Sequence, residues 1–77
     1  MAKSLHLHAP GTPVSWRWGS ATAHGVIESV HTESITITSK GTQVTRHGKP
    51  HNPAYLIVQP HHAHKVLKLH SEVSETP

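Results

Sequence analysis

Apolar and polar residues alternate in short runs along this chain, and no long segment repeats apolar residues at helical spacing, so the pattern predicts β-strands. Val14, Trp16 and Trp18 alternate with polar residues, which predicts a first strand with one apolar face. A second strand is expected over residues 23–31, after a Gly-Ser turn signal. Gly25 within it suggests a β-bulge or a sharp bend, which a small closed barrel needs.

The clearest hairpin is formed by residues 34–38 and 42–46, and the sequence also predicts its register. If residues 40–41 make a two-residue turn, Ile37 pairs with Val44. These two side chains then share one face of the hairpin, while the threonines share the other. The turn and the apolar pattern therefore agree on one register.

Two more strands are expected in the second half of the chain. Residues 54–59 form a continuous apolar run that is typical of a central strand. Residues 65–69 form the last strand, with Leu67 and Leu69 facing inward, and Ser71 is expected to cap a single helical turn. Five or six short antiparallel strands in so short a chain indicate an all-β protein, a small SH3-like barrel.

The length of 77 residues allows one domain with a thin core. We expect residues 7–73 to form this domain, between a flexible N-terminal tail (residues 1–6) and a C-terminal tail (residues 74–77). No apolar run reaches the ~20 residues of a membrane span. The chain has no cysteine, which excludes disulfides and thiolate metal sites and fits a cytoplasmic location.

The sequence offers no arrangement of residues for enzyme catalysis. It contains no Asp to orient a catalytic imidazole, no nucleophile-elbow motif and no glycine-rich phosphate loop. None of its four Glu residues pairs with another in a recognisable motif. We therefore expect a non-enzymatic protein without a cofactor.

Several motifs, in this order and spacing, resemble one known family. They are V-S-W at residues 14–16, N-P-A-Y-L-I at residues 52–57, V-L-K at residues 66–68 and S-E at residues 71–72. This set is similar to the Tudor-like domain of the hypervirulence-associated proteins, and the resemblance spans about residues 7–73. It implies a single Tudor-like, SH3-type barrel and no particular activity, because a fold does not determine a function.

Ten histidines are the most unusual feature of the composition. His6 and His8 lie two residues apart, and His61, His62 and His64 crowd the turn before the last strand, where the family usually has an acidic, glycine-containing turn. Neutral imidazole suits zinc, copper and nickel, so these three residues are weak candidates for a loosely bound ion. Because no four-ligand spacing is present, we favour solvated surface histidines and expect no metal site.

The candidate binding residues are few, since the chain has only three aromatic residues and a net charge of +3. Trp16 lies in mid-strand and is expected in the core, which argues against a complete aromatic cage for a methylated side chain. Trp18 and Tyr55 are candidates for a two-ring surface that binds a protein or peptide partner at the loop rim. Arg46 and Lys49 offer the alternative, weak and non-specific binding of single-stranded nucleic acid by a basic hairpin and loop. The oligomeric state stays open.

Overall fold

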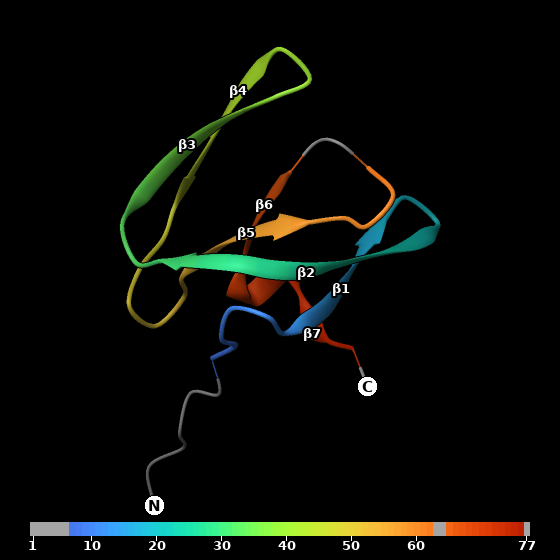
Figure 1. Ribbon diagram of the computed structural model, residues 1–77. Coiled ribbons are helices and arrows are strands. Elements are labelled where there is room, and N and C mark those ends of the chain that lie inside the picture. The colour runs from blue at the N-terminus through green and yellow to red at the C-terminus, as the bar shows by residue number, and fades with distance from the viewer. Residues whose placement is uncertain (1–6, 63–64, 77) are drawn as a thin grey trace, which may run out of the picture.

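The computed structural model describes residues 7–62 and 65–76 and confirms the all-β class (Figure 1). The predicted tail at residues 1–6 lies outside the described residues. The described part contains seven strands and one short 3₁₀ turn: β1 (Pro13–Trp18), β2 (Ala21–His31), β3 (Ser34–Ser39), β4 (Thr42–His47), β5 (Ala54–Val58), β6 (Val66–Leu69), η1 (His70–Glu72) and β7 (Ser74–Glu75).

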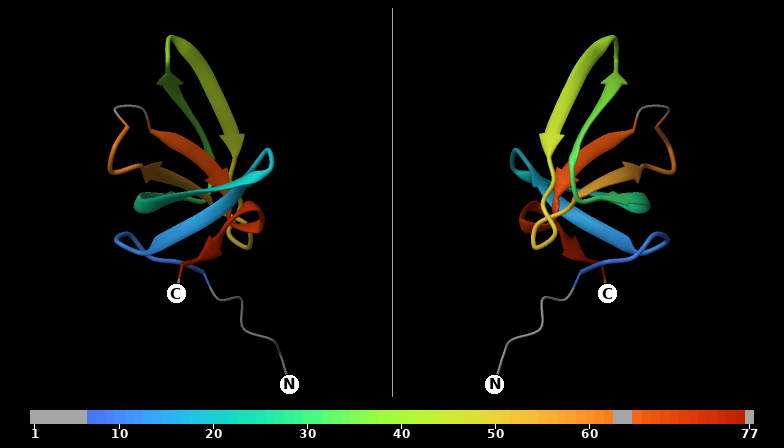
Figure 2. Two further views of the ribbon diagram at one scale, coloured as in Figure 1. Left: turned by 90° about the vertical axis from the view of Figure 1, so that its right-hand side faces the viewer. Right: turned by 90° about the vertical axis from the view of Figure 1, so that its left-hand side faces the viewer.

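The strands form two sheets rather than one continuous ladder. Five strands follow the order β6-β5-β2-β1-β7, and β3 and β4 make a separate two-stranded hairpin. Figure 2 shows from two sides that this hairpin projects away from the five-stranded sheet. At its tip, the Ser39 hydroxyl donates a hydrogen bond to the carbonyl of Lys65, at 3.2 Å. Within the described residues, therefore, the hairpin is attached to the start of β6 without closing the predicted barrel.

The predicted register of the β3–β4 hairpin is confirmed. Ile37 pairs with Val44 across the ladder, and the predicted pair of opposing threonines, Thr36 and Thr45, is joined by a hydroxyl–hydroxyl hydrogen bond of 2.7 Å. Lys40 and Gly41 form the two-residue turn with φ values of 55° and 78°. Positive φ at both central residues is the type I′ geometry, whose twist matches that of the flanking strands.

The irregularity expected at Gly25 lies elsewhere in β2. The register between β2 and β5 shifts between Ile27 and Ser29, so the bulge is at Glu28, while Gly25 stays in regular register with β1. Gly25 is needed because the sheet packs closely around it. A Cβ atom at this position would meet a methyl group of Ile57 and would lie 2.8 Å from the carbonyl oxygen of Val58.

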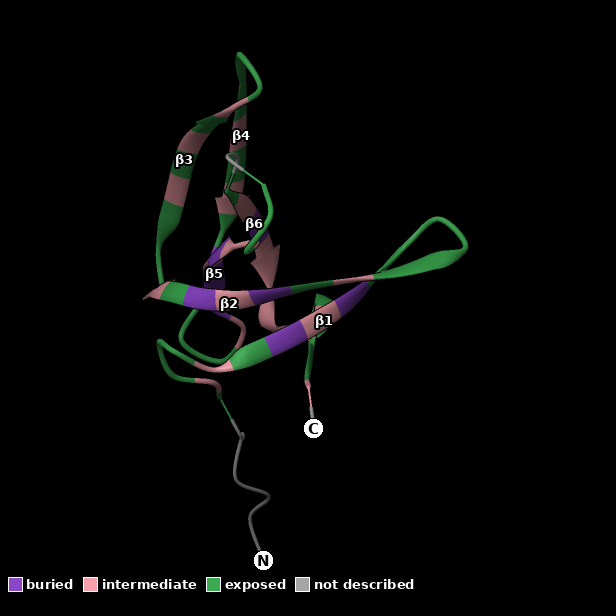
Figure 3. Cartoon of the chain, turned by 45° about the vertical axis from the view of Figure 1, so that its right-hand side comes forward, coloured by how far each residue is buried: buried purple, intermediate pink, exposed green. Residues whose placement is uncertain are grey.

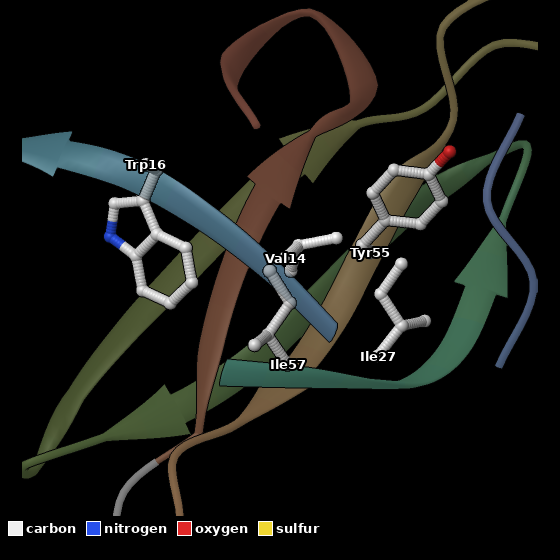
Figure 4. Packing of buried hydrophobic residues seen from close by; sticks show 5 residues of the cluster. All are labelled: Val14, Trp16, Ile27, Tyr55 and Ile57. Carbon is white, nitrogen blue, oxygen red and sulfur yellow. The ribbon is translucent and has the colours of Figure 1, made fainter. Parts of the chain in front are cut away.

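The core lies between β1, β2, β5 and β6, as the buried segments in Figure 3 show. Its central cluster consists of residues from three strands, drawn in Figure 4: Val14, Trp16, Ile27, Tyr55 and Ile57. Trp16 is only 5% exposed, which confirms its predicted burial, and Leu67 on β6 is also buried. Leu69, which was expected to face inward with it, is half-buried.

The C-terminal segment folds back onto the sheet. Its 3₁₀ turn spans His70–Glu72 and is not capped by Ser71, because Ser71 lies within the turn and Leu69 holds the N-cap position. The Ser71 N–H donates to Oδ1 of Asn52 at 2.9 Å. A carboxylate oxygen of Glu72 accepts the N–H of Leu69 at 2.8 Å and closes the turn. Beyond it, β7 pairs with β1, so the sheet includes two residues that the sequence pattern assigned to the C-terminal tail.

Candidate functional site

An open groove of about 790 Å³ lies on the described surface. Three segments that are distant in sequence form its walls: the β1–β2 hairpin, the tip of the β3–β4 hairpin, and the β5–β6 region. The groove follows from the topology, because the projecting β3–β4 hairpin leaves a hollow between its tip and the β1–β2 hairpin. It lies at the rim of the loops, where a binding surface was expected.

Two tryptophans of β1 line the groove from the same face of the strand. Trp16 and Trp18 are two residues apart, so their side chains project to the same side, and both contribute to the groove wall. Their environments differ, because Trp16 reaches into the core while Trp18 is 71% exposed. The Trp18 ring is thus an exposed apolar surface, and the neighbouring Trp16 ring is held in place by the core.

The backbone around Trp18 explains this exposure. Trp18 is the last residue of β1 and pairs with Ala21 across the two-residue Gly19-Ser20 turn. The small Ala21 side chain covers little of the indole ring, and Gly19 adopts a positive φ of 60° that permits the tight turn. The tryptophan therefore stands beyond the core, on the edge of a regular hairpin.

The polar residues of the groove are cationic or neutral. Lys40 comes from the β3–β4 turn and Lys68 from β6, and neither has a carboxylate partner in the part of the chain that the structure describes. Three histidines also line the groove: His24, His61 and His62. No Glu lines it, so the electrostatic character of the groove is positive.

The structure separates the four predicted partner-binding residues. Trp18 lies in the groove, as described above, but Arg46 and Lys49 do not line it. Arg46 is half-buried and forms an ion pair of 3.4 Å with Glu72. Lys49 is exposed in a turn that is closed by backbone hydrogen bonds with Asn52. Arg46 and Lys49 thus do not combine their charges with the aromatic surface.

The prediction that Tyr55 belongs to an exposed two-ring surface is wrong. Its side chain is completely buried in the core cluster, and its hydroxyl accepts the backbone N–H of His8 at 3.0 Å. The hydroxyl is also 2.8 Å from Nδ1 of His70. Burial raises the pKa of the Tyr55 phenol, against a smaller opposite effect of the His8 hydrogen bond. Tyr55 therefore connects the chain termini to the core and is not available to a partner.

The metal candidates are only partly within the described residues. His61 and His62 are exposed on the groove wall, whereas His6 and His64 lie outside the part that the structure describes. Among the described residues, no three histidine or carboxylate side chains gather in an arrangement that would hold a metal ion. The expectation of no metal site stays a prediction.

Sequence reasoning missed Lys40 and Lys68 as groove residues. Both were visible as basic residues, but only the fold shows that the β3–β4 turn and β6 face the end of β1. One signal for Trp18 was present in the sequence, because this tryptophan ends an alternating strand directly before a Gly-Ser turn. A large apolar residue at the end of a hairpin strand has few neighbours to bury it.

A comparison with protein-family models identifies the chain. The model described as the TUDOR domain of hypervirulence associated proteins matches residues 11–73. The chain belongs to this family. The match covers β1 through η1, and therefore all the strands that build the core and the groove.

Membership of the hypervirulence associated TUDOR family supports a coarse functional class. Tudor-like domains are generally non-catalytic modules that bind proteins or nucleic acids, so the family indicates a small interaction module. The comparisons with curated proteins and with solved structures found no match. In the described part of the chain, no helix has the length and apolar character to cross a membrane.

Proposed function

We propose that this protein is a non-enzymatic interaction module that binds a segment of a protein partner in the groove at its loop rim. The exposure of Trp18 carries this proposal. A tryptophan with 71% of its surface in solvent is unusual in a chain with three aromatic residues, and it stands at a concave site. Tryptophan is enriched among the residues that dominate protein binding energies.

The size and composition of the groove support a peptide segment as the ligand. A volume of about 790 Å³ is in the range of ligand-binding pockets in general. Trp16 is packed in the core and fixes one wall, so the groove is formed before a ligand binds. A preformed site avoids part of the ordering cost of association.

The alternative, nucleic-acid binding by Arg46 and Lys49, has less support. The charge of Arg46 is compensated by Glu72, and the one exposed Trp or Tyr ring, Trp18, lies in the groove that Lys49 does not line. Nucleic acid is therefore an outcome for the experiment to detect and not a second proposal.

The test is a selection from a display library of short random peptides against the full chain, followed by affinity measurements on two variants. Trp18→Ala removes the exposed ring from the groove. Leu7→Ala is the matched control, because Leu7 is the other exposed large apolar residue in the described chain and does not line the groove. Selected peptides should bind the wild type and Leu7→Ala alike, and should lose roughly tenfold or more in affinity for Trp18→Ala.

A second readout uses the indole itself. Because Trp16 is buried, a peptide that enters the groove should change mainly the emission of Trp18, and this change should be absent in Trp18→Phe. The proposal is overturned if no peptide is selected, or if selected peptides bind Trp18→Ala as tightly as the wild type. Salt-sensitive binding of an oligothymidine without peptide binding would favour the nucleic-acid alternative.

A further inference from the structure

The groove brings two lysines together with no glutamate among its lining residues. Outside the groove, two of the four described Lys and Arg residues have carboxylate partners: Nζ of Lys65 lies 2.8 Å from Oε1 of Glu28, and Arg46 is paired with Glu72 at 3.4 Å. The other two, Arg17 and Lys49, have none among the described residues. In the groove, Lys40 and Lys68 have no such partner among the described residues. Two lysines without carboxylate partners among the described residues therefore line the same groove as the exposed Trp18.

None of the four Glu side chains, all of which belong to described residues, lines this groove. Glu28 and Glu72 are in the ion pairs described above, and Glu75 is 3.8 Å from Nδ1 of His8. Glu33 lies in the connection between β2 and β3 and does not line the groove. A ligand in the groove therefore meets positive charge and no negative side chain.

We propose that the groove selects an acidic peptide, in which an apolar side chain contacts Trp18 and neighbouring carboxylates approach Lys40 and Lys68. This inference rests on the proposed function and names the chemistry of its ligand. The charge complementarity is direct, since carboxylates would supply the partners that the two lysines lack. A partly enclosed site also screens such pairs less than open solvent does.

The same observations disfavour a cationic ligand. A methylated lysine or arginine side chain binds through several aromatic rings that surround its charge. Here Trp18 is the one exposed ring, Tyr55 is buried in the core, and the nearest formal charges are positive. A cation placed in this groove would be repelled by Lys40 and Lys68.

Nucleic acid is also negatively charged, but the groove fits it less well. Strands without base pairing are bound along extended basic channels in which successive bases stack on aromatic rings. This groove has one exposed tryptophan, two lysines and three histidines that are neutral at pH 7, and therefore only two fixed positive charges. Such a site can neutralise only about two phosphates, which gives little affinity at physiological salt.

The experiment compares two double variants that carry the same change in net charge. Lys40→Gln with Lys68→Gln neutralises the groove, whereas Arg17→Gln with Lys49→Gln removes two cations that lie outside it. Arg17 is on the face of β1 opposite to Trp16 and Trp18, so this control leaves the indole ring in place. Thermal melting of both variants confirms that they are folded.

The probes are peptides obtained by selection on the wild type, as described above, and copies in which every Asp and Glu is changed to Asn and Gln. Selected peptides should be rich in Asp and Glu. They should lose roughly tenfold in affinity for the groove variant and less than about twofold for the control. The neutral copies should bind weakly to the wild type and should not distinguish the two double variants. Binding of the acidic peptides should weaken as salt is added.

Two results separate this inference from the proposed function. If selected peptides require Trp18 but are not acidic, or bind both double variants equally, the acidic preference is wrong and the interaction module stands. If no peptide is selected, both are wrong. An oligothymidine that binds more tightly than the acidic peptides and is lost in the groove variant would overturn the acidic peptide in favour of a single strand.

Discussion

The hydroxyl of Tyr55 lies 2.8 Å from Nδ1 of His70, and the ring that carries this hydroxyl is completely buried. The hydroxyl also accepts the backbone N–H of His8, so its own proton is available for donation to His70. The rings of His8 and His70 lie 5.0 Å apart, beside the tyrosine. One side chain thus joins the segment before β1, the strand β5 and the turn after β6.

Replacement of Tyr55 by Phe should lower the free energy of unfolding by about 1–3 kcal/mol. The phenyl ring still fills the core, but the His8 N–H and Nδ1 of His70 both lose a hydrogen-bond partner in a partly buried place. Urea denaturation followed by tryptophan fluorescence measures the loss. Thr36→Val is the control, because it removes an exposed hydroxyl pair with Thr45 and should cost about 0.5 kcal/mol or less.

The raised pKa of Tyr55 predicts a loss of stability in alkali. Burial disfavours the phenolate, so the folded protein ionises at higher pH than the unfolded chain, whose tyrosine has the ordinary pKa of about 10. Below that pH both states keep the proton, and this group leaves stability unchanged. As the pH rises further, the unfolded chain releases its proton first, so the free energy of unfolding falls.

Denaturation curves of the wild type and of Tyr55→Phe, measured from neutral pH to above pH ~10, isolate this effect from the ionisation of lysines. The difference in stability between the two proteins should shrink as the pH rises. A difference that stays constant would contradict the assigned burial of the phenol.

Contacts between residues close together in the sequence could be predicted for this protein, whereas contacts between distant residues could not. The Ile37–Val44 register was predictable because a two-residue turn and an alternating pattern fix it within a dozen residues of chain. Tyr55 was misassigned because an apolar run shows that a strand is buried but does not show whether the hydroxyl of a tyrosine in it finds a hydrogen-bond partner inside the protein. The hydroxyl partners, His8 and His70, lie far from Tyr55 in the sequence.

The groove was not predictable for a related reason. Trp18 was identified from its place in the chain, but Lys40 and Lys68 join it only through the arrangement of the β3–β4 hairpin beside the five-stranded sheet. Charge compensation is equally hidden, since Arg46 and its partner Glu72 come from segments 26 residues apart (72 − 46). The sequence therefore indicated candidate residue types for binding, and the tertiary structure shows which of them line one groove.

The two tryptophans of β1 should differ sharply in their effect on stability. Trp16→Ala removes a ring that is 5% exposed and should cost about 3–5 kcal/mol, which is close to the whole stability of a small domain. Trp18→Ala removes a ring that is 71% exposed and should change stability by about 0.5 kcal/mol or less. Circular dichroism melting of both variants measures the contrast.

Because Trp16→Ala is expected to unfold the chain, Trp16→Phe provides a measurable intermediate. It keeps an aromatic ring of smaller volume in the core and should melt between the wild type and Trp16→Ala. Near-normal melting of Trp16→Ala would show that this ring does not support the core.

Gly25→Ala tests the close packing between β2 and β5. A Cβ atom at this position would lie 2.8 Å from the carbonyl oxygen of Val58 and would also meet a methyl group of Ile57. Neither the carbonyl nor the branched methyl can move without displacing β5. We expect a loss of about 1–3 kcal/mol, the usual cost of overpacking, measured by urea denaturation.

The control for this variant is Ala23→Gly, two residues earlier on the same strand and paired with Trp16. This control removes one methyl group from β2, whereas Gly25→Ala adds one. It should cost about 1 kcal/mol or less through backbone entropy alone.

A combined Gly25→Ala and Ile57→Ala variant separates the two contacts. If the Ile57 methyl is the main obstacle, Gly25→Ala should cost less stability in the Ile57→Ala background than in the wild type. If the Val58 carbonyl is the main obstacle, the cost should be the same in both backgrounds. An unchanged melting temperature for Gly25→Ala alone would mean that β2 and β5 are not packed at this distance, and that Gly25 has no steric role.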